Sequence, residues 1–157
     1  MNKKDPAHMP ITITQERPDS PDAIQLINEL QTVLSQEMYP DESRHGYSVE
    51  KLLREGVAFF ITRIDDFPAG CGGIQLFGVE YGEVKRMYVR PQYSGLGLGK
   101  LMLDHLSAYA REKRIFTLRL ETGIYQKETI QLYEGYGFAR RGPFGDYKND
   151  PMSIYRR

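Results

Sequence analysis

The sequence predicts an α/β (α+β) domain in which helices cover a mixed β-sheet. Two observations support this class. Strand-like segments follow one another as hairpins between residues 57 and 91. Beyond residue 94, helical and strand patterns alternate, which is the order of a βαβ crossover. The length of 157 residues fits one domain, which we expect over residues 10–157 after a flexible tail over residues 1–9.

The first elements combine one strand with two helices. Residues 11–17 (ITITQER) alternate as a strand does. A helix follows, with Ser20 or Asp22 as its cap and apolar residues at helical spacing: Ile24, Ile27, Leu30, Val33 and Leu34. Residues 48–56 (SVEKLLREG) predict a short second helix that Gly56 ends.

The middle of the chain predicts three antiparallel strands. Residues 57–78 form a hairpin whose turn lies at Asp65-Asp66. Residues 81–91 form the third strand, and Pro91 ends it. The apolar positions of this strand change phase, since 84 to 87 is an odd step and 87 to 89 an even one. A change of phase predicts a β-bulge.

The remaining segments predict two helices and at least two strands. The first helix covers residues 94–114, and a strand follows over 116–123. A shorter helix over 126–138 is expected to be broken by its two glycines. The turn-rich end, 139–157, predicts one or two final strands.

Composition excludes several function classes. Lys plus Arg and Asp plus Glu number 21 each, so the zero net charge argues against nucleic acid or an anionic membrane as partner. A single cysteine, Cys71, excludes an internal disulfide, and the three histidines lack ligand spacing, so no metal is expected. The polar N-terminus lacks the apolar region of a secretory signal, which predicts a cytoplasmic location.

The glycine run SGLGLGK (94–100) is the most informative motif. It lacks the first glycine and the final hydroxyl of a Walker A loop, and Lys100 stands where a dinucleotide fingerprint has its third glycine. Glycines at alternate positions where a helix opens leave the backbone N–H groups of Gly95 to Lys100 accessible to a diphosphate. The alternative is that these glycines only let the helix pack closely against the sheet.

Three segments resemble the GNAT family of N-acetyltransferases. VRPQYSGLGLGKL (89–101) resembles the family's acetyl-CoA signature, with Gly97 and Gly99 at its glycine positions and Ser94 where Arg or Gln usually stands. EVKRMYV (83–89) resembles the fourth strand. QKETIQLYEGYGF (126–138) resembles the last helix, with Gln126 in place of the usual Asn.

The resemblance implies a fold and a cofactor site. The fold is that of acyl-CoA N-acyltransferases: a mixed, mostly antiparallel sheet of about six or seven strands, splayed between the fourth and fifth and flanked by about four helices. Acetyl-CoA would serve as co-substrate without a metal. The residues implied to bind it are Met87, Tyr88, Val89, Ser94, Gly95, Leu96, Gly97, Leu98, Gly99, Lys100 and Gln126.

The implied reaction is direct transfer of the acetyl group to a primary amine of a small molecule or of a protein or peptide. Glu83 is the candidate general base, and Tyr133 the acid that protonates the leaving thiolate. The alternatives are that Glu83 is an ordinary exposed strand residue paired with Lys85, with Glu121 as a rival base, and that Tyr133 is a core aromatic.

The acceptor site is the least specified part. Tyr39, Tyr47, Glu121 and Tyr147 are candidate substrate-binding residues, although a solvated loop explains the polar segment 39–48 equally well. A regulatory module that binds CoA without turnover is one alternative function. An acyltransferase of different acyl or acceptor specificity is another, and the fold is compatible with a homodimer.

Overall fold

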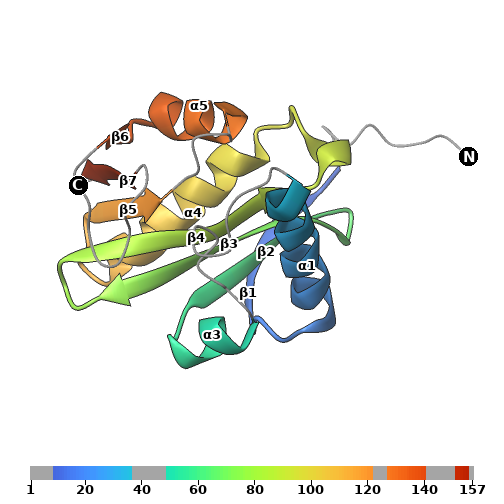
Figure 1. The fold of residues 1–157 in the computed structure, drawn as a ribbon, viewed down its shortest axis with the longest axis horizontal. Coiled ribbons are helices and arrows are strands. Elements are labelled where there is room, and N and C mark those ends of the chain that lie inside the picture. Colours follow the sequence, from blue (N-terminus) through green and yellow to red (C-terminus); the bar gives the residue numbers. More distant parts are fainter. Residues whose placement is uncertain (1–8, 37–48, 122–126, 141–150, 156–157) are drawn as a thin grey trace, which may run out of the picture.

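The computed structural model describes residues 9–36, 49–121, 127–140 and 151–155. Seven strands form one sheet in the order β1-β2-β3-β4-β5-β7-β6 (Figure 1). The strands are β1 (Ile11–Glu16), β2 (Ala58–Ile64), β3 (Phe67–Phe77), β4 (Tyr81–Val89), β5 (Thr117–Glu121), β6 (Ala139–Arg140) and β7 (Pro151–Tyr155). Only β4 and β5 pair in parallel in this sheet. The prediction of a mixed, mostly antiparallel sheet is therefore confirmed.

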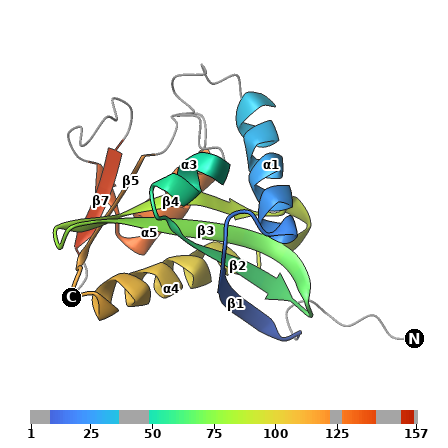
Figure 2. The same cartoon turned by 90° about the horizontal axis from the view of Figure 1, so that it is seen from below.

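Helices cover both faces of the sheet. The helices are α1 (Pro21–Gln36), α3 (Val49–Arg54), α4 (Leu98–Glu112) and α5 (Lys127–Tyr136), and a 3-10 turn, η2, covers Pro91–Tyr93. Figure 2 shows α1 and α3 on one face and α4 on the other. The α5 helix lies beside α4, and the Tyr136 hydroxyl donates a 2.8 Å hydrogen bond to Asp104 of α4. None of the helices in the described segments is long and apolar enough to cross a membrane.

The hydrophobic core is divided by the sheet. Under α4, side chains of the helix such as Met102 and Leu106 pack against Val84 and Leu118 of the strands. Under α1 and α3, Leu26 and Leu52 pack against the opposite face of β2 and β3. Each face of the sheet therefore has its own helix layer, and residues that alternate along β4 point to different layers.

Several local predictions are confirmed. Ser20 caps α1, because its side chain accepts a 3.2 Å hydrogen bond from the Ala23 amide. Asp65 and Asp66 have φ values of 49° and 70° between β2 and β3, the conformation of a two-residue hairpin turn. The bulge in β4 lies at Arg86, whose φ is 57°, where the register with β3 shifts. The bulge places Lys85 and Arg86 on the α1 and α3 side, and Met87 on the α4 side.

Two predicted boundaries are wrong. The helix expected from residue 94 begins at Leu98, because Gly95 and Gly97 adopt left-handed backbone conformations that an α-helix excludes. Gly135 does not break the last helix, which includes it and ends at Tyr136. Gly137, with a φ of 119°, provides the actual stop.

Candidate active site

The candidate site lies where β4 and β5 diverge. Their parallel ladder consists of Gly82 with Leu118 and Glu83 with Arg119. Beyond Glu83, β4 continues to Val89 with β3 on one side and no ladder to β5 on the other. The predicted splay between the fourth and fifth strands is confirmed. It leaves one edge of β4 available, over Met87, Tyr88 and Val89, to an extended ligand.

The turn before α4 presents backbone donors at the same end of β4. Gly95 and Gly97 have φ values of 80° and 77°, and a Cβ atom at either position would meet nothing within 4 Å. In the described part of the chain, the amides of residues 95–100 donate no hydrogen bond, and the next one, of Leu101, donates to Gly97 at 3.1 Å. The 15-residue helix thus begins without a side-chain cap, and its unpaired N–H groups and positive dipole end favour an anion.

The third glycine has a different role. A Cβ atom on Gly99 would lie 2.7 Å from the Leu132 side chain of α5. The close-packing explanation therefore applies to Gly99, with a neighbouring helix in place of the sheet as the partner. The other two glycines are required by backbone conformation, since a side chain in the left-handed region costs about 1–2 kcal/mol.

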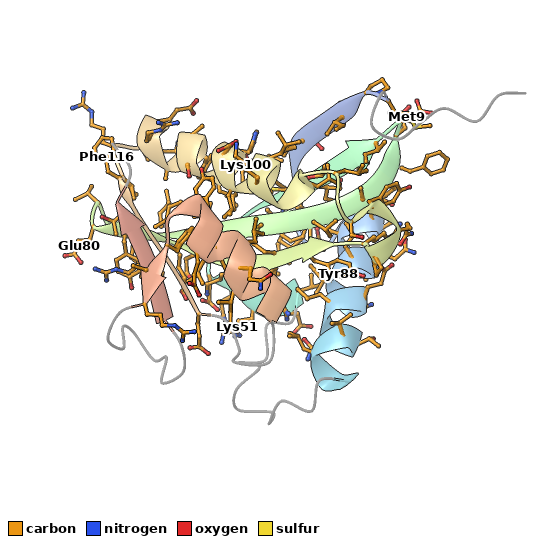
Figure 3. The ribbon with its side chains drawn as sticks, turned by 90° about the horizontal axis from the view of Figure 1, so that it is seen from above. Met9, Lys51, Glu80, Tyr88, Lys100 and Phe116 are labelled. Atoms are coloured by element: carbon orange, nitrogen blue, oxygen red, sulfur yellow. The ribbon has the colours of Figure 1, made fainter. Side chains whose placement is uncertain are left out.

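The end of β4 is fixed to α1 by side chains. Glu29 of α1 accepts a 2.7 Å hydrogen bond from Arg90 and a 3.1 Å hydrogen bond from the Tyr88 hydroxyl. The Arg90 guanidinium, and then the Tyr88 hydroxyl, hold the pKa of Glu29 below its usual value. Figure 3 shows Tyr88 beside α1 and Lys100 on α4. Sequence reasoning missed this pair, because 61 residues separate Glu29 from Arg90 and Glu29 belongs to no motif.

Glu83 is buried at the point where the strands part. It is 3% exposed, so the alternative of an exposed strand residue is wrong, although Lys85 does lie beside it, with Nζ 3.7 Å from Oε2. Burial raises the pKa of Glu83 to about 7, against an opposing effect of the Lys85 ammonium. The other carboxylate oxygen, Oε1, is buried without a hydrogen-bond partner among the described residues. A carboxylate with such a pKa can accept a proton near neutral pH.

Tyr133 lies on the opposite face of the sheet from Glu83. It is 4% exposed and packs in the core under α4 with Val84, Leu118 and the ring of Phe138, whose centroid is 5.5 Å away. Burial raises the pKa of its hydroxyl well above the usual value. Tyr133 is therefore a core aromatic that keeps its proton at neutral pH, a property that a general acid also needs.

The remaining predicted residues divide into two groups. Glu121 ends β5 and is half-buried. Tyr39, Tyr47, Gln126 and Tyr147 lie outside the described residues.

The Cys71 thiol is buried and donates to the Arg86 carbonyl at 3.2 Å, and burial raises its pKa to about 12. That environment disfavours the thiolate that a covalent acetyl-enzyme would need.

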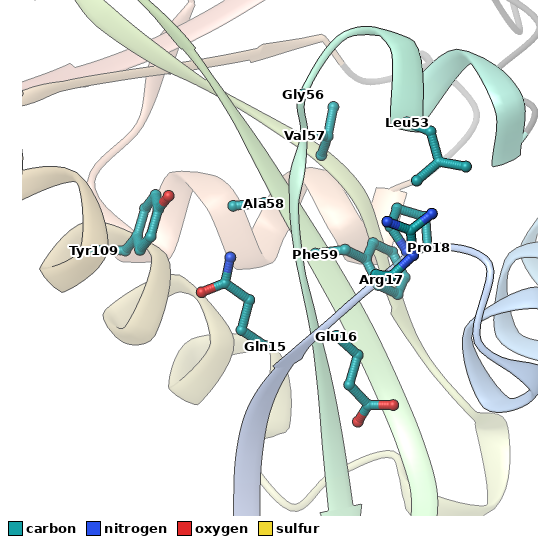
Figure 4. Close-up of a pocket in the computed structure, with 10 residues that line it drawn as sticks. All are labelled: Gln15, Glu16, Arg17, Pro18, Leu53, Gly56, Val57, Ala58, Phe59 and Tyr109. Carbon is teal, nitrogen blue, oxygen red and sulfur yellow. The ribbon is translucent and has the colours of Figure 1, made fainter.

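A surface cavity lies elsewhere, at the start of β2 (Figure 4). Residues of β2, α3, α4 and the segment at the end of β1 line it, among them Arg17, Leu53, Phe59 and Tyr109. None of the predicted site residues contributes to this cavity. We therefore place the candidate site at the strand divergence, where the unpaired amides and the buried carboxylate lie, and not at this cavity.

Comparison with known proteins identifies the family of the chain. A family model described as the acetyltransferase (GNAT) family matches residues 24–138. The chain is 40% identical to an IAA acetyltransferase of Azospirillum brasilense over 92% of its length and 95% of the relative's. It is 37% identical to YedL of Escherichia coli K12, an uncharacterized N-acetyltransferase, over 74% of each chain.

A solved structure matches the fold at lower sequence identity. The PaiA N-acetyltransferase of Thermoplasma acidophilum, solved in complex with coenzyme A, superposes with a TM-score of 0.77 at 22% identity, covering 94% of this chain and 99% of that one. The chain therefore belongs to the GNAT family of acetyltransferases and has the acyl-CoA N-acyltransferase fold.

Proposed function

We propose that the protein transfers the acetyl group of acetyl-CoA directly to a primary amine. The observation that carries this proposal is the set of amides of residues 95–100 that find no acceptor among the described residues, beside the edge of β4 that β5 leaves unpaired. The donors suit a diphosphate and the edge suits an extended amide chain, and coenzyme A joins these two groups in one molecule.

The described residues fit coenzyme A at both ends of the site. Gly95 and Gly97 leave open space where side chains would block a phosphate, and their left-handed backbone turns the amides outward as a nest. Lys100 adds a positive charge at the same turn, although its side chain is 70% exposed and lies 3.4 Å from Asp104. We assign binding of the pantetheine arm to the main chain of Met87, Tyr88 and Val89.

Glu83 is the proposed general base. Its carboxylate Oε1 is buried and unpartnered in the described segments, at the last strand pair before the opening. An acceptor that arrives as an ammonium ion must lose a proton before its nitrogen is nucleophilic. Glu83 takes this proton, directly or through a water molecule, and its pKa of about 7 suits the transfer near neutral pH.

Tyr133 is the proposed general acid on the other side of the opening. Acetyl-CoA supplies the acetyl group as a thioester, whose leaving group is a thiolate that needs a proton. The Tyr133 hydroxyl keeps its proton because burial raises its pKa. Base and acid lie on opposite faces of the sheet, and in this proposal the parted strands give both access to one ligand.

The acceptor is proposed only as a class. A buried carboxylate flanked by Lys85 selects a group that can give up a proton, which an amine does. The Azospirillum relative is named for acetylation of IAA, so IAA belongs in the panel of acceptors to be tested. Amino acids, polyamines, aminoglycosides and peptides complete that panel.

The test is a turnover assay that follows thiol release from acetyl-CoA over the acceptor panel. We expect Glu83→Gln to lower kcat/KM about 100- to 10,000-fold for an amine that the wild type acetylates. Glu80→Gln is the matched control, since Glu80 is exposed in the turn before β4. Acetyl-CoA that binds without turnover of any acceptor would favour a regulatory module, and full activity of Glu83→Gln would remove Glu83 from the mechanism.

A further inference from the structure

The candidate base, Glu83, and a second carboxylate, Glu55, share one buried ammonium group, that of Lys85. Lys85 of β4 has a side chain that is 4% exposed, and its Nζ lies 3.2 Å from Oε2 of Glu55 and 3.7 Å from Oε2 of Glu83. Glu55 directly follows α3, so it reaches the strand from the covering helix layer. The shorter contact is therefore the one to Glu55, and Glu83 receives the weaker share of the positive charge.

The unequal sharing leaves Glu83 incompletely neutralised. An ion pair at 3.7 Å is too long for a hydrogen bond of ordinary strength. Glu83 Oε1 has no hydrogen-bond partner among the described residues. If Lys85 moved fully to Glu83, its ammonium would stabilise the carboxylate and weaken it as a base. The position of Lys85 thus sets how readily Glu83 accepts a proton.

Other groups near Glu83 are distributed over the packed elements. Lys51 of α3 lies 3.8 Å from Oε1 of Glu55. On β3, Gln75 is the cross-strand partner of Glu83. On the other side of β4, Arg119 of β5 is the ladder partner of Glu83. Its guanidinium lies 4.3 Å from the centroid of the Tyr81 ring. Glu55 is thus the carboxylate that shares Lys85 with Glu83 in the described part of the chain.

We propose that Glu55 is a positioning residue that holds Lys85 away from Glu83 and so keeps the Glu83 carboxylate free to deprotonate the acceptor. This inference rests on the proposed role of Glu83. In the step concerned, the acceptor ammonium loses a proton and becomes a neutral amine, and the Glu83 carboxylate gains that proton and becomes a carboxylic acid. Glu55 and Lys85 keep their charges throughout.

The test is the pH profile of kcat/KM for Glu55→Gln. The variant keeps the size of the side chain but removes the charge that competes for Lys85. We expect the acid limb of the pH profile to move down by about one pH unit, because the Glu55 charge no longer competes with Glu83 for the Lys85 ammonium. Glu55→Asp retains the charge and should leave the limb within about 0.3 units of wild type. Glu50→Gln, an exposed change on α3, the helix that Glu55 follows, is the control.

The outcomes separate this inference from the role of Glu83. An unmoved limb in a folded Glu55→Gln protein, with Glu83→Gln inactive, would overturn the positioning role alone. Full activity of Glu83→Gln would remove the basis of both. A purely structural role for Glu55 predicts lower activity at every pH with an unchanged limb. Lys85→Met removes the ammonium that lowers the pKa of Glu83. The acid limb of the folded variant should therefore move to higher pH, opposite to the shift expected for Glu55→Gln.

Discussion

Two regions of the candidate active site are built on different principles. The turn at residues 95–100 offers main-chain amides at an exposed helix start. Its glycines contribute by leaving open the space that side chains would fill. The charged cluster of Glu83, Lys85 and Glu55 consists of side chains in a largely buried place, and its properties depend on their spacing. The first region should tolerate changes of side-chain charge, and the second should not.

Changes in the side chains proposed for catalysis should have the largest effects on turnover. Tyr133→Phe removes only the hydroxyl of a core ring, so we expect kcat to fall about 100-fold without loss of folding. Thiol-release kinetics and circular dichroism measure the two quantities. Tyr136→Phe is the control, because it deletes hydrogen bonds to Asp104 and Ser107 and should lower stability while sparing kcat. Equal kcat values for the two variants would leave Tyr133 as a core aromatic alone.

The buried base should also reduce stability at high pH. Burial raises the pKa of Glu83 in the folded protein to about 7, while the ordinary pKa of a glutamate is 4.5. Stability from this group is therefore complete below about pH 4.5 and is lost as the pH rises through 7. Glu83→Gln should be more stable than wild type at pH 8 by about 1–3 kcal/mol, with little difference near pH 4. Urea unfolding at both pH values tests this, and lower stability of Glu83→Gln at pH 8 would contradict it.

The main-chain region should respond to backbone strain and very little to charge. Gly97→Ala forces a side chain into the left-handed region, so we expect the Kd for acetyl-CoA to rise about 10-fold, from a cost of about 1–2 kcal/mol. Lys100→Ala should raise the Kd less than about 3-fold, because an exposed charge contributes little. Isothermal titration calorimetry measures both. A larger effect for Lys100→Ala than for Gly97→Ala would reverse the assignment of binding to the main chain.

The two regions also differ in how far the sequence predicts them. The glycine run and the phase change in the strand before it are local patterns, and they predicted the turn and a bulge, which lies at Arg86. The splay was implied by the resemblance to the family. The helix start was placed too early, because alternating glycines signal a turn without saying where the left-handed residues end. Such local patterns can be read from the sequence because they reflect which backbone conformations each residue type allows.

The charged cluster could be predicted only in part. The sequence singles out Glu83 and its neighbour Lys85, but not the burial that raises the pKa of Glu83. Glu55 comes from a segment 30 residues away from Lys85, and Glu29 is 61 residues from Arg90. Such pairs depend on how helices dock on the sheet, and a single sequence contains no period or spacing that records this docking. Glu55 could have been suspected only because it follows a helix whose apolar face must meet the strands.

The contact between Gly99 and Leu132 connects the proposed diphosphate site to the helix that carries the proposed general acid. Leu132 occupies the space that a side chain at position 99 would fill, and the next residue along α5 is Tyr133. A tilt of α5 that moved the Tyr133 hydroxyl would also move Leu132 away from Gly99, so the proposed diphosphate site and the proposed general acid are mechanically coupled. A methyl group added at position 99 would meet the flexible end of the Leu132 side chain, and a shift of that side chain would accommodate it.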